Sequence, residues 1–304
     1  MWLIELAVIV LLGVSARAIG EAAAYTRWVR LAVHLMIAAF ALLSLALVIV
    51  ATAVGERALA IRAIGAGLGV GLAWLGSYRR FLARWVPIDP GSILDTMGLA
   101  ALQGTIGFFG GALLASETLP PFEVTVEQLS GQAVAEVFLA FIWIGFPTRR
   151  GWREALERLG LRGVDRRAVA ASIVFTLALF ALSVVTSLVA SVLQPGIVER
   201  IEERLLPLTT AFASPVEALA LGLLAGTGEE ILFRGAIQPR YGLLLTALLF
   251  TVLHVQYELS IVSLGVFGLA ILLGLERRWF GTTACILTHA LYDALAILLQ
   301  GTLR

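Results

Sequence analysis

Long apolar runs without a charged side chain alternate with short polar segments along nearly the whole chain. Residues 31–54 hold 24 uncharged residues in succession, and a helix of that length crosses a hydrocarbon core of about 30 Å. We expect ten such spans, at residues 2–16, 31–54, 59–78, 96–116, 129–147, 168–193, 213–237, 241–257, 259–275 and 280–300. The pattern predicts an all-α polytopic membrane protein.

The first span is short, but it does not have the pattern of a cleaved signal peptide. No basic segment precedes it, and Glu5 interrupts its apolar run. We therefore expect residues 2–16 to be retained as a membrane segment.

The third span carries four glycines at alternate positions. Glycines four positions apart share a helix face, and this small-xxx-small spacing lets another helix approach closely. We interpret them as packing residues without a chemical role: Gly65, Gly67, Gly69 and Gly71.

The most basic stretch, residues 148–167, holds seven arginines. Apolar side chains recur in it near helical spacing, which predicts a surface helix on anionic lipid headgroups. These side chains are Trp152, Leu156, Leu159 and Leu161.

The arginines also predict the orientation of the chain, because basic residues gather in cytoplasmic loops. With the N-terminus outside, the cytoplasmic loops hold 17 of the 22 arginines, at residues 17–30, 79–95, 148–167, 233–240 and 276–279. This distribution predicts ten spans with both ends outside, and we expect the protein in the plasma membrane.

Composition supports a membrane protein as well. Only 14% of the residues are charged and 60% are hydrophobic, whereas a soluble domain carries about 25% charged residues. The single cysteine, Cys285, excludes an intramolecular disulfide. We expect one membrane domain, in which residues 1–120 have no assigned role and residues 121–304 form the functional core.

Residues 226–235 place Glu229, Glu230 and Arg234 in otherwise apolar surroundings. A charge inside the membrane is expensive and therefore usually serves a function. Two of the three histidines in the chain, His254 and His289, follow inside later apolar runs.

At 1.5 Å per helical residue, Glu229, His289 and His254 would lie roughly 12, 15 and 20 Å from the cytoplasmic surface. We therefore expect one bundle with an intramembrane polar cavity that opens toward the cytoplasm. A carboxylate there can act as a general base or acid, and histidines can hold water, donate to an oxyanion or bind a metal.

Three pairs of these residues are each four positions apart, so each pair shares a helix face. In order, composition and spacing they resemble the three motifs of the CAAX-protease and bacteriocin-processing (CPBP) family, intramembrane endopeptidases related to the eukaryotic type II CAAX prenyl endopeptidase. The resemblance covers roughly residues 150–300, and its motifs are Glu229-Glu230-x-x-x-Arg234, Phe250-x-x-x-His254 and His289-x-x-x-Asp293.

This resemblance implies that Glu229 activates water, with Glu230 and Arg234 in support. It implies that His254 and His289 stabilise the substrate carbonyl or the oxyanion.

Many family members have Asn where this chain has Asp293, and Phe250 belongs to the supporting part of its motif. The resemblance implies that the residue at this position donates a hydrogen bond to the oxyanion. An aspartate donates only when protonated, so orienting His289 is the alternative role of Asp293. Two mechanisms stay open: a glutamate-dependent reaction without a metal, and a zinc-dependent one with Glu229, His254 and His289 as candidate ligands. The helical zinc signature His-Glu-x-x-His is absent.

The expected partners are the lipid bilayer and a peptide or membrane-protein substrate, with no nucleic acid. The substrate class stays open among CAAX-type proteins, pheromones, bacteriocin leaders and anti-sigma factors. Two alternative functions are a proton-coupled transporter with the Glu and His groups as a relay, and a non-catalytic immunity protein of the same fold. Other intramembrane polar residues are interpreted as packing groups, with lining of the cavity as the alternative for Glu136.

Overall fold

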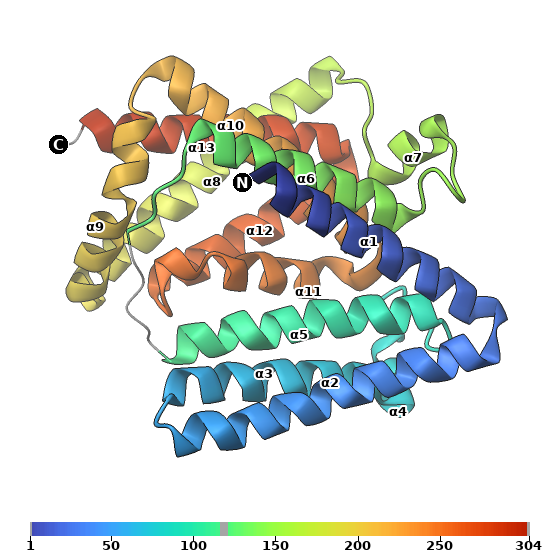
Figure 1. Ribbon diagram of the computed structural model, residues 1–304. Coiled ribbons are helices and arrows are strands. Elements are labelled where there is room, and N and C mark those ends of the chain that lie inside the picture. The colour runs from blue at the N-terminus through green and yellow to red at the C-terminus, as the bar shows by residue number, and fades with distance from the viewer. Residues whose placement is uncertain (1, 116–120, 303–304) are drawn as a thin grey trace. The chain divides into compact units, whose positions relative to one another are not determined.

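The computed structural model describes residues 2–115 and 121–302, and no strand occurs among them (Figure 1). The first helices are α1 (Trp2–Tyr25), α2 (Arg27–Ala53), α3 (Arg57–Trp74), α4 (Gly76–Leu82), α5 (Ile93–Ala115), α6 (Val126–Ile144) and α7 (Trp152–Leu159). They are followed by α8 (Arg166–Leu193), α9 (Pro195–Ala211), α10 (Pro215–Glu229), the π-helix η1 (Glu230–Ile237), α11 (Gln238–Leu253), the short 3₁₀ turn η2 (Val255–Tyr257), α12 (Ile261–Phe280) and α13 (Thr282–Thr302). The all-α prediction is confirmed.

The chain forms two compact units, and each is described by itself. Unit 1 holds Met1–Val14, Leu119–Pro239 and Ser260–Arg304, and unit 2 holds Ser15–Thr118 and Arg240–Leu259. The chain therefore passes from unit 1 into unit 2 near the start of α11.

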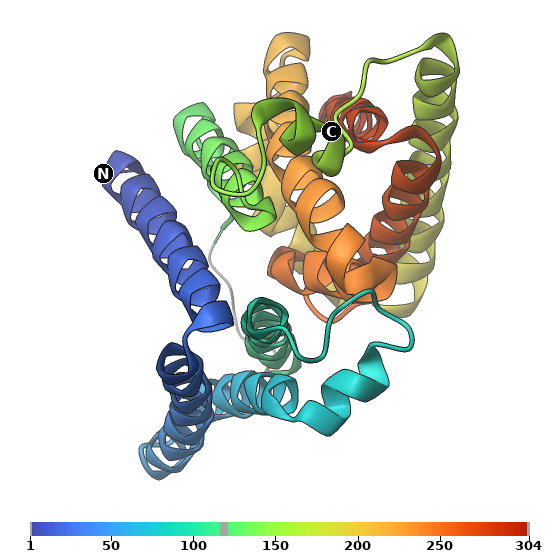
Figure 2. The same cartoon turned by 90° about the vertical axis from the view of Figure 1, so that its right-hand side faces the viewer.

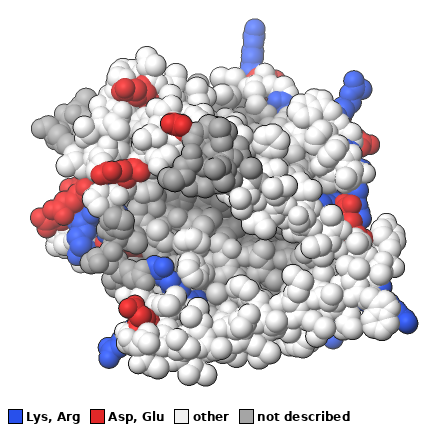
Figure 3. Space-filling model, in the orientation of Figure 1, with Lys and Arg blue, Asp and Glu red and all other residues white. Residues whose placement is uncertain are grey.

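Seven segments of the described residues are long and apolar enough to cross a membrane: Val8–Tyr25, Arg27–Ala53, Arg57–Trp74, Ile93–Ala115, Arg166–Leu193, Pro215–Leu253 and Thr282–Gln300. They confirm a multi-pass membrane protein, and most of the surface visible in Figure 3 carries no charge. The segment Pro215–Leu253 includes α10, η1 and α11, and the last of these is broken at Gly242, whose φ is 79°. The ten spans stay a prediction.

Three polar loops expected from the sequence are helical instead, and one of them, residues 276–279, lies within α12. Helix α1 continues past residue 16 to Tyr25, and α2 begins at Arg27, so most of residues 17–30 is helical. An ion pair of 2.7 Å between Arg17 and Glu21, one turn apart, supports the longer helix.

Residues 233–240 are likewise helical, as parts of η1 and α11, and both of their arginines have carboxylate partners. Arg234 is buried beside Glu230, and Arg240 binds Asp95 with two guanidinium nitrogens within unit 2. Bidentate pairing of this kind fixes the guanidinium in one orientation.

In unit 2, α3 packs closely on α5, and the two helices lie side by side in Figures 1 and 2. A Cβ atom on Gly65 would lie 2.0 Å from the carbonyl oxygen of Gly107, and one on Gly69 would lie 2.2 Å from that of Gln103. Another on Gly67 would lie 2.9 Å from Ser44 on α2. The predicted packing role is confirmed for these glycines, whereas Gly71 has no neighbour within 4 Å.

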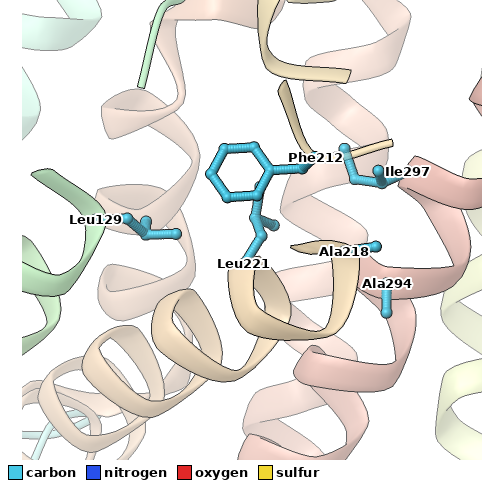
Figure 4. Close-up of a cluster of buried hydrophobic side chains, with 6 residues drawn as sticks. All are labelled: Leu129, Phe212, Ala218, Leu221, Ala294 and Ile297. Carbon is cyan, nitrogen blue, oxygen red and sulfur yellow. The ribbon is translucent and has the colours of Figure 1, made fainter. Parts of the chain in front are cut away.

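Unit 1 is held together by apolar contacts among α6, α10, α13 and the end of α9 (Figure 4). Phe212 and Ala218 are almost completely buried at the centre of this cluster. The other members of the cluster are Leu129, Leu221, Ala294 and Ile297. This packing fixes the direction of α10 toward its last residue, Glu229.

Helix α7 differs from the expected surface helix, because its apolar face packs against protein. Leu159 is fully buried in a cluster with Ile231 and Ala236 of η1. The absence of a side chain on Gly235 permits this contact, since a Cβ there would lie 3.1 Å from the Leu159 carbonyl oxygen. The Trp152 end of the helix and Glu157 are exposed.

The segment after α7 is bonded to the first turn of α13. The Thr282 amide donates to the carbonyl of Gly160 at 2.9 Å. The Thr283 hydroxyl accepts from the amide of Arg162 at 3.0 Å and donates to its carbonyl at 2.9 Å. These bonds tie the basic stretch to the helix that carries His289.

Candidate functional site

Glycines on α10 let two neighbouring helices approach the end of this helix. A Cβ atom on Gly222 would lie 2.4 Å from the Ala290 carbonyl oxygen of α13, and one on Gly226 would lie 3.3 Å from the His289 Cβ. On another face, a Cβ on Gly228 would lie 2.7 Å from the Ala133 Cα of α6. These three glycines of α10 therefore bring side chains of α6 and α13 beside Glu229.

Glu230 is completely buried and firmly bound. Its Oε1 accepts a hydrogen bond from Arg234 at 3.0 Å and lies 2.7 Å from Nδ1 of His289. Arg234 is 1% exposed. Two cationic or proton-donating groups thus share one carboxylate oxygen, which satisfies much of the charge that burial would otherwise leave uncompensated.

The backbone around Glu230 is a π-helix, a wide turn that often occurs at functional sites. At its end the Gln238 amide donates to the carbonyl of Phe233, five residues earlier. The side chain of the same residue, Gln238, donates to the Gly274 carbonyl on α12 at 2.8 Å. The turn that carries Glu230 and Arg234 is therefore anchored to α12.

Glu229, the neighbour of Glu230, is held differently. Its side chain is 14% exposed, and its Oε2 is buried and accepts no hydrogen bond. The nearest cationic group is His289, whose Nε2 lies 4.0 Å from this oxygen. Oε2 of Glu230 also accepts no hydrogen bond, but the Glu230 side chain is 0% exposed, so Glu229 is the acid of the pair that is open to water.

His289 lies between acids on both of its ring nitrogens. Nδ1 faces Glu230, while Nε2 is 4.0 Å from Glu229 and 3.4 Å from Oδ2 of Asp293. Asp293 is one turn further along α13 and 19% exposed. The spacing His289-x-x-x-Asp293 thus places both side chains on the same face, as the sequence predicts.

Glu136 on α6, for which the sequence leaves packing and lining of the cavity open, lies beside Glu229. Its Oε1 accepts from the Gln132 side chain at 3.0 Å, and its Oε2 is buried without a hydrogen bond. That Oε2 would be only 2.4 Å from a Cβ on Gly228, so the carboxyl lies against the backbone next to Glu229. An acid inside an otherwise apolar helix was the signal for it.

The second motif belongs to unit 2, where its two residues contact each other. The rings of Phe250 and His254 are 4.4 Å apart, and Nδ1 of His254 lies 2.7 Å from the Phe250 carbonyl oxygen. His254 follows the last residue of α11 and precedes η2. The four-residue spacing therefore serves to pack the phenyl ring on the imidazole and to orient its Nδ1.

The three candidate zinc ligands are divided between the units: Glu229 and His289 belong to unit 1 and His254 to unit 2. Among the residues that the structure describes, no three His, Cys, Asp or Glu side chains are grouped to hold a metal ion. Within unit 1, Nδ1 of His289 is already engaged by Glu230. The described residues of either unit therefore do not form a zinc donor set.

Comparison with curated proteins found no match, and comparison with solved structures found none either. A family model does match, over residues 210–295. That segment contains all three motifs but less than a third of the chain. The resemblance suggested by the motifs is thereby confirmed: residues 210–295 match the family described as type II CAAX prenyl endopeptidase Rce1-like.

Proposed function

We propose that this protein is an intramembrane endopeptidase of the CAAX type, in which Glu229 activates the hydrolytic water. The observation that carries the proposal is the difference between the two adjacent acids. Both acids have an Oε2 without a hydrogen bond, but the Glu230 side chain is 0% exposed and its Oε1 is bound to Arg234 and His289, whereas the Glu229 side chain is 14% exposed. A general base needs such a free oxygen within reach of water.

Glu229 and His289 have the separation that a bridging water requires. Two polar atoms more than 3.5 Å apart are commonly joined through one water, and their distance here is 4.0 Å. A water there would donate one proton to Glu229 and present its oxygen to a peptide carbonyl.

The reaction then follows as ordinary hydrolysis. The water oxygen bonds to the carbonyl carbon as its proton passes to Glu229, and a tetrahedral oxyanion forms. When the carbon–nitrogen bond breaks, Glu229 returns the proton to the leaving amine. His289, positively charged when it donates to both Glu230 and Asp293, would stabilise the negative charge that develops on the substrate.

The other motif residues support this centre. Glu230 and Arg234 hold His289 and the π-helix, and Asp293 orients the Nε2 side of the imidazole. Following the family resemblance, we assign His254 to the substrate carbonyl or oxyanion, with Phe250 packed against its ring.

The substrate would be a membrane-anchored protein or peptide, as in CAAX-type, pheromone or bacteriocin-leader processing. We further propose that the site opens toward the cytoplasm of a plasma-membrane protein, because arginines gather in the segments on that side. The comparisons give no support to a proton-coupled transporter or a non-catalytic immunity protein.

The test uses Glu229→Gln and His289→Ala in the full-length protein, purified and reconstituted in lipid vesicles. The matched control is Glu127→Gln, an exposed glutamate in the first turn of α6. Membrane proteins that have been exposed to the wild-type or to a variant protein are then compared for newly formed termini. We expect both site variants to abolish the new termini and the control to retain them. Cleavage at wild-type rates by both site variants would refute the assignment.

A further inference from the structure

Glu276 is a buried acid that none of the three motifs contains. It precedes Arg277 and Arg278 near the end of α12, in residues 276–279, which the distribution of arginines predicts to be a cytoplasmic loop. In the structure its side chain is 0% exposed. A carboxylic acid is seldom buried in this way unless other groups hold it.

The groups that hold Glu276 come from two neighbouring helices. Its Oε1 accepts a hydrogen bond from the Thr288 hydroxyl of α13 at 2.7 Å, and the Ser172 hydroxyl of α8 lies 3.4 Å from the same oxygen. The same hydroxyl, which has one proton to donate, also lies 3.0 Å from the Ala168 carbonyl oxygen in α8 and 3.1 Å from the Ala284 carbonyl oxygen of α13. The acid therefore joins α8, α12 and α13.

Thr288 directly precedes His289, so this junction acts on the turn that carries the imidazole. The Thr176 hydroxyl of α8 lies 3.3 Å from the Thr288 carbonyl oxygen and 2.8 Å from the Ser172 carbonyl oxygen. From η1, Glu230 holds the ring of His289 at 2.7 Å. Residues 288 and 289 are thus bound by two buried glutamates, Glu276 through the hydroxyl and Glu230 through the imidazole.

We propose that Glu276 is a positioning residue, which acts through Thr288 to keep His289 between Glu230 and Glu229. The effect of Glu276 on the reaction rests on the proposed function. Its effect on the position of the imidazole does not depend on that function. If the turn rotated, Nδ1 would lose Glu230 and Nε2 would move away from Glu229. Displacements of about 1 Å at a reacting group can lower rates by about 100-fold.

The experiment compares Glu276→Leu, Glu276→Gln and Thr288→Val in the full-length protein. Leucine has a similar size but no acceptor, whereas glutamine retains an oxygen that accepts from Thr288. The matched controls are Glu127→Leu and Thr210→Val, which change exposed side chains in the same unit.

Two readouts are measured, one of them independent of activity. The chain contains only three histidines, so ¹⁵N-histidine NMR resolves His289 once His289→Ala has identified its signal. The second readout is kcat and KM with a cleaved substrate. Thermal unfolding of each variant reports its stability.

We expect Glu276→Leu and Thr288→Val to shift the His289 signal and to lower kcat by about 10- to 100-fold with KM nearly unchanged. We expect Glu276→Gln to retain most of the wild-type kcat. Because Glu276 acts through Thr288, the double variant Glu276→Leu with Thr288→Val should lose little more than either single variant.

An unchanged His289 signal and kcat in Glu276→Leu would overturn the proposal, even if the melting temperature fell. If Glu276→Leu fails to fold, the same result in Thr288→Val decides against it. If the wild-type protein and Glu229→Gln cleave equally, the proposed function fails, and the His289 signal still decides whether Glu276 positions the imidazole.

Discussion

His289 Nδ1 and Glu230 Oε1 lie 2.7 Å apart, although 59 residues separate them in the chain. This contact distinguishes two glutamates that are neighbours in sequence and chemically identical. It binds Oε1 of the fully buried Glu230 to α13, whereas the partly exposed Glu229 has its Oε2 4.0 Å from the other ring nitrogen.

We predict that Glu230→Gln lowers the melting temperature by several degrees more than Glu229→Gln. Removing one partner of a buried ion pair costs about 3–5 kcal/mol, because the remaining charge stays buried. Arg234, 1% exposed, would be that charge. Thermal unfolding of both variants in the same detergent measures the difference. Equal melting temperatures would show that the pair of Glu230 and Arg234 does not stabilise unit 1.

We predict that Gly228→Ala lowers both stability and activity. Its Cβ would lie 2.4 Å from the Glu136 carboxyl and 2.7 Å from the backbone of Ala133, and such overpacking costs about 1–3 kcal/mol. Unfolding and cleavage assays measure the two effects.

The control for that variant is Gly71→Ala, which is also in a helix but has no neighbour within 4 Å. There the methyl group should be neutral or should stabilise the protein by about 0.5–1 kcal/mol. A Gly228→Ala protein as stable and active as the control would contradict the close packing of α6 on α10.

We predict that cleavage is retained after treatment with a metal chelator, because the described residues do not form a zinc donor set. Elemental analysis of the same preparation should find less than one zinc per chain. Loss of cleavage on chelation, with recovery after zinc is added back, would instead establish a metal-dependent reaction.

We predict that Thr282→Val loosens the segment after α7. The hydroxyl of Thr282 is fully buried and donates to the Leu159 carbonyl, and losing this bond costs about 1 kcal/mol or more. Because residues 148–167 hold seven arginines, limited trypsin digestion should cut there sooner. Thr210→Val, which changes an exposed hydroxyl, serves as control, and equal digestion of both variants would rule out the anchoring role.

Helical periodicity and apolar length were sufficient to predict the all-α fold and the same-face pairs of each motif. Glu230 with Arg234 and His289 with Asp293 both depend on a spacing of four residues, a local property of a helix. The glycines of α3 were likewise predicted as packing residues, since their size alone permits close approach.

Contacts between distant segments could not be predicted in this way. Glu276 follows an apolar run and precedes two arginines, which favoured an exposed position. Its burial depends on hydroxyl groups of Thr288 and Ser172, and local periodicity does not encode these partners. For the same reason, no pattern identified which of the two adjacent glutamates would bind His289.

The bonds between residues 160–162 and residues 282–283 also bear on how the protein is made. Synthesis proceeds from the N-terminus, so α7 leaves the ribosome well before the threonines that anchor it exist. The bonds that anchor residues 160–162 can therefore form only after the last helix has been inserted. Assembly of the site is consequently a late event in biogenesis, and a chain that stops before α13 lacks both His289 and the anchor for α7.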